Sequence, residues 1–227
     1  MSNILNLDIY IIVARIMVIL LILPLHEYAH AFAARKCGDY TAESSGRLTL
    51  NPFAHVDPIG AVLLLLTGFG WAKPVPVNPN AMRNPRNGII WTSLAGPFSN
   101  LIVAFIAFII LRVLGGIPFT SDQSVIFNAL SSFSLILMYF ITVNIGLAVF
   151  NLIPIPPLDG SKVLIQFLPT RAVIWIQRNQ MVISIVFMVL VVSGILGVPI
   201  SFISGKIYDF FFWSTGWIDI IMNAVTG

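Results

Sequence analysis

Long apolar runs constrain this chain more than any other feature of its sequence. Residues 9–25, 89–114, 130–152 and 173–196 are almost entirely hydrophobic, and a helix needs about 20 such residues to cross a bilayer. Only 9% of the 227 residues are charged, against about 25% in soluble domains. We therefore expect an all-α, multi-pass integral membrane protein with about four to six membrane helices.

The basic residues predict how the chain is oriented. They gather between the first apolar run and residue 89 and again after residue 160, whereas residues 115–130 contain no Lys or Arg. Cytoplasmic loops of membrane proteins are enriched in Lys and Arg, so both clusters are placed in the cytosol and the N-terminus outside. Topology explains the net charge of +3, so no nucleic-acid partner is expected. The single cysteine, Cys37, excludes an internal disulfide.

A fifth apolar segment, "IGAVLLLLTGFGWA" at residues 59–72, is too short to cross. If it did cross, half of the first basic cluster would lie outside, so we expect a re-entrant or interfacial segment. Residues 46–50, "GRLTL", alternate enough for a short strand. A short β-hairpin there, near the site, is a candidate edge for holding an extended substrate. Residues 199–224 either span the membrane or lie in its interface.

The pattern H-E-x-x-H occurs at the cytosolic end of the first run, as His26, Glu27 and His30. Ionisable groups at membrane depth are costly and are usually functional. On a helix, residues four apart share one face, so both imidazoles can bind one ion. The glutamate lies beside the ion and serves as general base, which is the arrangement of zinc hydrolases. The alternative is a pair of helix-packing histidines with an exposed glutamate.

A catalytic zinc site needs a third protein ligand and an open position. The candidates are Glu43, His55, Asp57 and Asp159. Asp159 follows the break of an apolar helix in "NLIPIPPLDG", at the cytosolic end of another span and hence at the depth of the histidines. We therefore prefer Asp159, with His55 as the alternative.

Four further polar residues, expected in or close to the membrane interior, are candidates for a role near the metal site. Asn144 and Asn151 are seven residues apart, so they share one helix face, and that face should point inward because exposed amides are costly in lipid. Interhelical hydrogen bonding is the alternative role for each. His55 and Asp57, in "NPFAHVDPIG", are expected at the cytosolic mouth of a water channel, as a gate or as partners of a ligand carboxylate. The alternative is that they satisfy backbone groups of turns.

Three motifs together resemble the site-2 proteases, a family of intramembrane zinc metalloproteases. They are "HEYAH" in the first membrane helix, "AGPFSN" in a middle one and "NLIPIPPLDG" at the end of another. The core motifs cover residues 26–160, and residues 172–224 are expected to form peripheral helices of the same domain, which spans residues 1–227. No PDZ-like insertion interrupts the motifs, as in compact members of the family.

The resemblance implies one Zn²⁺ per chain, bound by His26, His30 and Asp159. Glu27 is then the base and proton shuttle, and Asn151 a polar group near the substrate or its oxyanion. It further implies an endopeptidase of a prokaryotic cell membrane, cleaving single-span or other transmembrane proteins near the cytosolic face. A metal-binding transporter and a non-catalytic, zinc-stabilised scaffold are the alternatives. A transporter has no special need for a carboxylate next to the first histidine, and a structural zinc site is usually closed by four protein ligands, of which only three are convincing here.

Overall fold

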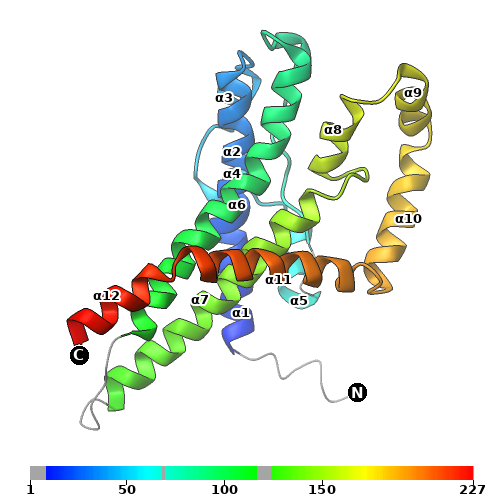
Figure 1. The fold of residues 1–227 in the computed structure, drawn as a ribbon. Helices are drawn as coiled ribbons and strands as arrows, with labels where there is room; N and C mark the ends of the chain where they lie inside the picture. Colours follow the sequence, from blue (N-terminus) through cyan, green and yellow to red (C-terminus); the bar gives the residue numbers. More distant parts are fainter. Residues whose placement is uncertain (1–8, 68–69, 117–123, 227) are drawn as a thin grey trace.

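The computed structural model describes residues 9–67, 70–116 and 124–226, and these are almost entirely helical (Figure 1). The α-helices are α1 (Ile9–Met17), α2 (Leu23–Lys36), α3 (Thr41–Ser44), α4 (Pro52–His55), α5 (Pro58–Thr67), α6 (Pro85–Gly115), α7 (Ser124–Asn151), α8 (Asp159–Ile165), α9 (Thr170–Arg178), α10 (Gln180–Val192), α11 (Gly197–Ser214) and α12 (Trp217–Thr226). A π-helical turn, η1 (Val18–Ile22), joins α1 to α2, and a 3-10 turn, η2 (Pro79–Ala81), precedes α6. The predicted all-α fold class is confirmed.

Three helical segments are long and apolar enough to cross a membrane, namely Ile11–Lys36, Pro85–Gly115 and Val125–Asn151. The pair α9 and α10, bent by 70°, would make a fourth if it is one broken span. This confirms a multi-pass membrane protein. The described residues contain three candidate spans, or four if the bent pair is one span, against the four to six membrane helices predicted. Most of the predicted linker between α6 and α7, and residues 68–69 of the short apolar segment, lie outside the described residues.

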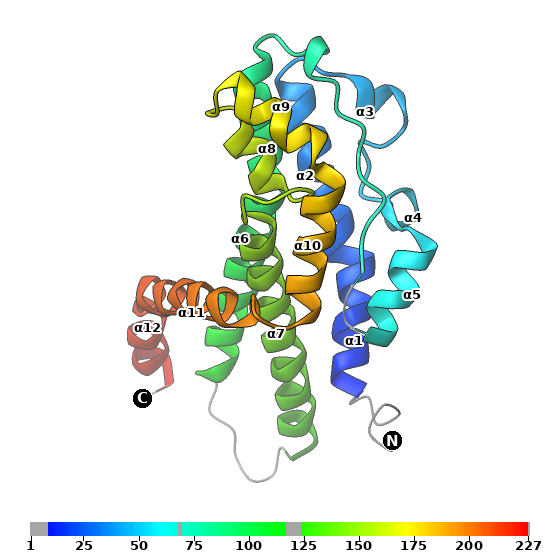
Figure 2. The same cartoon turned by 90° about the vertical axis from the view of Figure 1, so that its right-hand side faces the viewer.

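The core lies where α6 packs against α2 on one side and α7 on the other (Figures 1 and 2). Ile22, Ala104, Ile141 and Ile145 meet there, each at most 1% exposed. Small residues such as Ala104 let membrane helices approach closely, so that van der Waals contacts hold them together where lipid gives no hydrophobic driving force. This packing fixes the positions of α2, α6 and the end of α7 relative to one another.

The first span changes its hydrogen bonding shortly before the two histidines. The N–H of Leu23 donates to the carbonyl of Val18, five residues back, which makes the turn π-helical. Pro24 follows at the start of α2. A proline has no N–H and clashes with the carbonyl four residues earlier, so the wider turn accommodates it. Such π turns often occur close to functional sites.

The short apolar segment turns back to the side from which it came. Val56 and Ala72 form an isolated antiparallel β-bridge, and the N–H of Lys73 donates to the carbonyl of His55 at 2.8 Å. The two ends of the segment therefore lie side by side. A Cβ at Gly60 would stand 2.2 Å from the carbonyl oxygen of Trp71, so glycine permits the close return of the chain. This is the geometry of the predicted re-entrant segment.

Arg15 holds the far end of this segment. It lies on α1, which packs against α5, and its Nη1 donates to the carbonyl of Leu65 at 2.6 Å. Carbonyls at the end of a helix have no partner within the helix, and lipid cannot supply one. The charged side chain inside the first span therefore has a structural role: it satisfies the end of α5.

After the segment, residues 73–78 run in an extended conformation beside α2 (Figure 2). We call them the strap. The N–H of Asn78 donates to Oδ2 of Asp39, just beyond α2, at 2.6 Å. At the other end, Nη2 of Arg47 donates to the carbonyl of Lys73 at 2.6 Å. The strand predicted for residues 46–50 was wrong: these residues form turns and bends, and Arg47 reaches the strap through its side chain rather than through a ladder.

The C-terminal helices surround this core. α8 packs against α6, α10 packs against α9, α11 lies across α7, and α12 contacts α6 (Figure 1). Arg112 near the end of α6 forms an ion pair with Asp219 of α12. Many apolar side chains on α10 and α11 are exposed, which suits helices that face lipid.

Candidate metal centre

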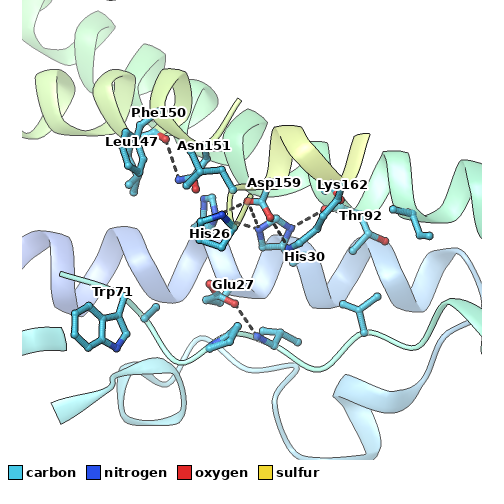
Figure 3. A pocket seen from close by; sticks show the side chains of 18 of the residues that line it. His26, Glu27, His30, Trp71, Thr92, Leu147, Phe150, Asn151, Asp159 and Lys162 are labelled. Carbon is cyan, nitrogen blue, oxygen red and sulfur yellow. Dashed lines mark hydrogen bonds and ion pairs between the residues drawn. The ribbon is translucent and has the colours of Figure 1, made fainter. Parts of the chain in front are cut away.

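Two parts of the chain bring three ligand groups together inside the bundle. His26 and His30 lie one turn apart on α2, and Asp159 begins α8 after the proline-rich break that follows α7 (Figure 3). The two Nε2 atoms lie 3.0 Å apart, and Oδ2 of Asp159 lies 3.4 Å from that of His26 and 3.1 Å from that of His30. All three side chains are buried. The aspartate preferred from the sequence is therefore placed at the histidines.

These three atoms have the spacing expected around one small metal ion. Ligand atoms about 2.0–2.1 Å from a tetrahedral zinc lie about 3.3 Å from one another. The observed separations of 3.0, 3.1 and 3.4 Å agree with that value. Two imidazoles and one carboxylate also form a donor set that leaves a fourth position open, as in catalytic zinc sites. The residues present therefore fit a zinc ion.

Helix α6 orients one of the histidines. Nδ1 of His30 lies 2.6 Å from the carbonyl oxygen of Thr92, which can only accept, so Nδ1 carries the proton. Nε2 of His30 is then left with a lone pair directed at the other two groups, the tautomer that a metal ligand needs. Nδ1 of His26 is buried and has no hydrogen-bond partner among the described residues.

The carboxylate of Asp159 uses its two oxygens differently. Oδ2 faces the histidines, whereas Oδ1 accepts a hydrogen bond from Nζ of Lys162 at 2.8 Å. The ammonium of Lys162 favours the ionised form of this buried carboxylate. The group is thus kept ionised, as metal binding requires.

Gly96 allows α6 to approach the histidines. A Cβ at this position would stand 2.4 Å from Nε2 of His30 and 2.6 Å from Cε1 of His26. Contacts below 3.0 Å are not tolerated, so any side chain at this position would displace the imidazoles. The glycine of "AGPFSN", expected to permit close helix approach, does so at the site itself.

Glu27 lines the same cavity from the next position of α2. The cavity has a volume of about 840 Å³ and is bounded by α2, the strap, α6, the end of α7, α8 and α10. Most of its wall is apolar, including Leu23, Phe150, Phe187 and Met188. Figure 3 shows Glu27 reaching toward the strap, where its Oε2 accepts a hydrogen bond from the N–H of Val75 at 2.9 Å.

Of the two asparagines expected on one inward face of α7, only Asn151 lines the cavity. Its Nδ2 donates to the carbonyl of Leu147 at 3.0 Å (Figure 3). Asn144 is buried deeper in the bundle, and its Nδ2 donates to the carbonyl of Phe140 at 2.9 Å. Both amides therefore bond to carbonyls of their own helix.

The structure does not bring His55 and Asp57 to the cavity. Nε2 of His55, fully buried, donates to the carbonyl of Thr49 at 2.8 Å. Oδ1 of Asp57 accepts from the N–H of Gly60 at 2.9 Å and so caps the start of α5. These contacts satisfy backbone groups of turns, which is the alternative role predicted for the two residues from the sequence.

Sequence reasoning missed three residues of this site, namely Thr92, Lys162 and Val75. Lys162 had a usable signal, because it lies three residues after Asp159 and so on the same face of a helix. Thr92 acts through its carbonyl, which every residue type provides, and Val75 through its N–H, which every residue type except proline provides. Neither side chain carries a signal for these contacts.

The comparisons with known proteins agree with this site. The model of Peptidase family M50 matches residues 14–194. "Putative zinc metalloprotease YwhC" of Bacillus subtilis is 41% identical over 173 residues, 74% of this chain and 75% of that protein. "Putative zinc metalloprotease Rip2" of Mycolicibacterium smegmatis is 33% identical over 147 residues, 62% of this chain and 52% of the relative.

A further relative, "Putative zinc metalloprotease MJ0611" of Methanocaldococcus jannaschii, is 31% identical over 144 residues, 61% of this chain and 62% of that protein. No solved structure matches the chain. The family match includes both histidines, the glutamate between them and Asp159. With three ligand groups converging inside a helical membrane bundle, this chain belongs to peptidase family M50, the site-2 protease family.

Proposed function

We propose that this protein is a zinc-dependent intramembrane endopeptidase that cleaves membrane-spanning segments of other proteins near the cytosolic face. The observation that carries the proposal is the convergence of His26, His30 and Asp159 beside Glu27, in one cavity within the helical bundle. Membership of a peptidase family favours this function over a transporter or a zinc-stabilised scaffold. Relatives named as zinc metalloproteases support zinc as the metal.

One zinc ion per chain would be held by His26, His30 and Asp159. Nζ of Lys162 donates to Oδ1 of Asp159, while Oδ2 faces the histidines. When bound, zinc supplies Lewis acidity, which polarises a carbonyl and makes a water molecule more acidic. Three protein ligands would leave one coordination position for these groups.

Glu27 is the general base and later the general acid. Its carboxylate takes a proton from the attacking water and delivers it to the leaving amine of the cleaved peptide bond. Asn151, which lines the cavity, supports the carbonyl oxygen of the substrate through its second amide hydrogen while the first stays on Leu147. A helix hides its peptide bonds, so the substrate must be extended where it enters the cavity.

The orientation follows from the basic residues around the two ends of the re-entrant segment. Arg35, Lys36 and Arg47 precede it, while Lys73, Arg83 and Arg86 follow it. Because these residues favour the cytosol, the end of α2 and the metal centre lie toward that side. Cys37, and a cysteine introduced by Asn84→Cys in a Cys37→Ser background, should each react with an impermeant thiol reagent only from the cytosol. Reaction of the two positions from opposite sides would contradict the re-entrant arrangement.

The function is tested with the purified protein and a panel of single-span substrates reconstituted in lipid vesicles. The wild type should bind about one zinc ion per chain and cleave at least one substrate within its membrane segment. Glu27→Gln should abolish cleavage and keep the zinc, because the ligands are intact. His26→Ala and Asp159→Ala should lose most of the zinc. Full cleavage by Glu27→Gln would refute the proposed mechanism.

A further inference from the structure

The carboxylate of the proposed base is held by the main chain of the strap. Oε2 of Glu27 accepts the N–H of Val75 at 2.9 Å, across 48 positions of sequence. Both residues line the cavity of the metal centre. The contact therefore lies within the site, and the role given to Glu27 above does not explain it.

The sequence of the strap restricts the backbone conformation around this donor. Val75 stands between Pro74 and Pro76, so it carries the only backbone N–H of these three residues. The ring of a proline fixes its own φ, and it also confines the preceding residue to extended conformations. In the sequence K-P-V-P-V the single N–H is thus offered from a stiff, extended chain, with little conformational entropy left to lose.

Contacts on both sides of Val75 keep the strap from sliding along α2. Arg47 holds the carbonyl of Lys73, and Asp39 holds the N–H of Asn78. The Val75 side chain is 9% exposed and packs in a small cluster with Ala31, one turn beyond Glu27 on α2. The donor and the carboxylate are therefore fixed in register by the same helix.

We propose that the strap positions the base: the N–H of Val75 fixes Oε2 of Glu27, so that Oε1 stays directed into the cavity to take and return the proton. This inference rests on the proposed function of Glu27. A carboxylate has two oxygens that accept, so a single N–H can hold one of them and leave the other free. Because a misplaced catalytic group can cost about 100-fold in rate, such positioning has a measurable consequence. Val75 is a positioning residue, since its backbone acts through Glu27.

The decisive variant is Val75→Pro, which removes the N–H and suits the extended chain around it. Its matched partner is Val75→Ala, which shortens the side chain and keeps the N–H. With a single-span substrate that the wild type cleaves, Val75→Pro should lower kcat at least about tenfold, with KM and zinc content within about twofold of the wild type. Val75→Ala should retain at least about a third of the wild-type kcat.

Equal losses of kcat in the two variants would mean that only the packing of the side chain matters, and would overturn the inference. Loss of zinc in Val75→Pro would also overturn it, because the strap would then support the metal centre and not the base. If Val75→Pro does not fold, Asp39→Ala is the alternative test, because it removes the hydrogen bond that holds the strap at Asn78. It should lower kcat at least about threefold with zinc retained, and wild-type kcat would overturn the proposal.

A measurement without turnover tests the contact itself. In metal-free protein, the thermal midpoints of Glu27→Ala, Val75→Pro and the double variant form a double-mutant cycle. The two effects should be non-additive, because either change removes the same hydrogen bond. Strict additivity would show that the bond does not form. Failure of the proposed function looks different: the wild type would cleave no substrate, or Glu27→Gln would remain active.

Discussion

The two sides of the cavity are built in different ways. On the metal side, Gly96 and Thr92 of α6 and Lys162 of α8 contact the ligand side chains directly, and the helices that carry them are packed together. On the strap side, Glu27 meets an extended chain that is held by a few hydrogen bonds at its ends and at Val75. One side is fixed by helix packing and the other by backbone hydrogen bonds.

This difference predicts which substitutions should reduce zinc binding and which should reduce stability. Closely packed helices cannot accept an added atom without moving the ligands, so changes on the metal side should appear as lost zinc. On the strap side, the hydrogen bonds of the extended chain go to Glu27, Asp39 and Arg47 and not to the three ligand side chains. Changes there should therefore alter stability or local opening while the zinc is retained.

Gly96→Ala should have the largest effect. Its new methyl group would overlap the rings of His26 and His30, so we expect most of the zinc to be lost and cleavage to fall by on the order of 100-fold or more. Metal analysis and turnover measure this. Gly146→Ala is the control, because a Cβ on this residue of α7 would meet nothing within 4 Å. Normal zinc content in Gly96→Ala would show that α6 does not constrain the ligands.

Lys162→Met should weaken zinc binding without abolishing it. Removing the partner of Oδ1 frees the carboxylate of Asp159 to turn, and loss of such a partner typically costs about 10–100-fold in metal affinity. Competition with a chelator of known affinity measures the change. Lys206→Met is the control, since Lys206 also pairs with an aspartate three residues away, Asp209, but on the surface of α11. Equal zinc affinities in the two variants would show that Lys162 does not support the metal ligands.

Arg15→Met should loosen the re-entrant segment and spare the metal centre. It leaves the carbonyl of Leu65 without its donor, which costs about 1–3 kcal/mol where no water replaces it. Hydrogen exchange of α5 should become faster by a corresponding factor, while exchange of α6 and the zinc content stay unchanged. Equal protection of α5 in the variant and the wild type would show that Arg15 does not hold this helix.

His55→Ala should have the smallest effect. The hydrogen bond to Thr49 supports the turn before the re-entrant segment, and its loss should cost about 1 kcal/mol of stability. We expect a lower thermal midpoint, with zinc content and turnover per folded molecule near those of the wild type. A sharp fall in turnover would instead favour the role at the mouth of a water channel that its sequence position suggested.

The sequence alone determined the membrane class and the nature of the site. Apolar runs of bilayer length predict helices because a chain in lipid must satisfy its own backbone. The spacing of His26 and His30 places both on one helix face, and the proline break before Asp159 brings a carboxylate to the same depth. The two ends of the short segment at residues 59–72 lie side by side, as expected for the predicted re-entrant or interfacial segment, whose length and flanking charges oppose a crossing.

Only the tertiary structure decided which backbone groups serve the site. The carbonyl of Thr92 and the N–H of Val75 carry no side-chain signal, and "GRLTL" alternates like a strand although no partner strand pairs with it among the described residues. His55 and Asp57 looked like candidates for the site but bond to nearby backbone groups and do not line the cavity. Local patterns report the face and depth of a residue, whereas contacts between distant segments depend on how the helices pack.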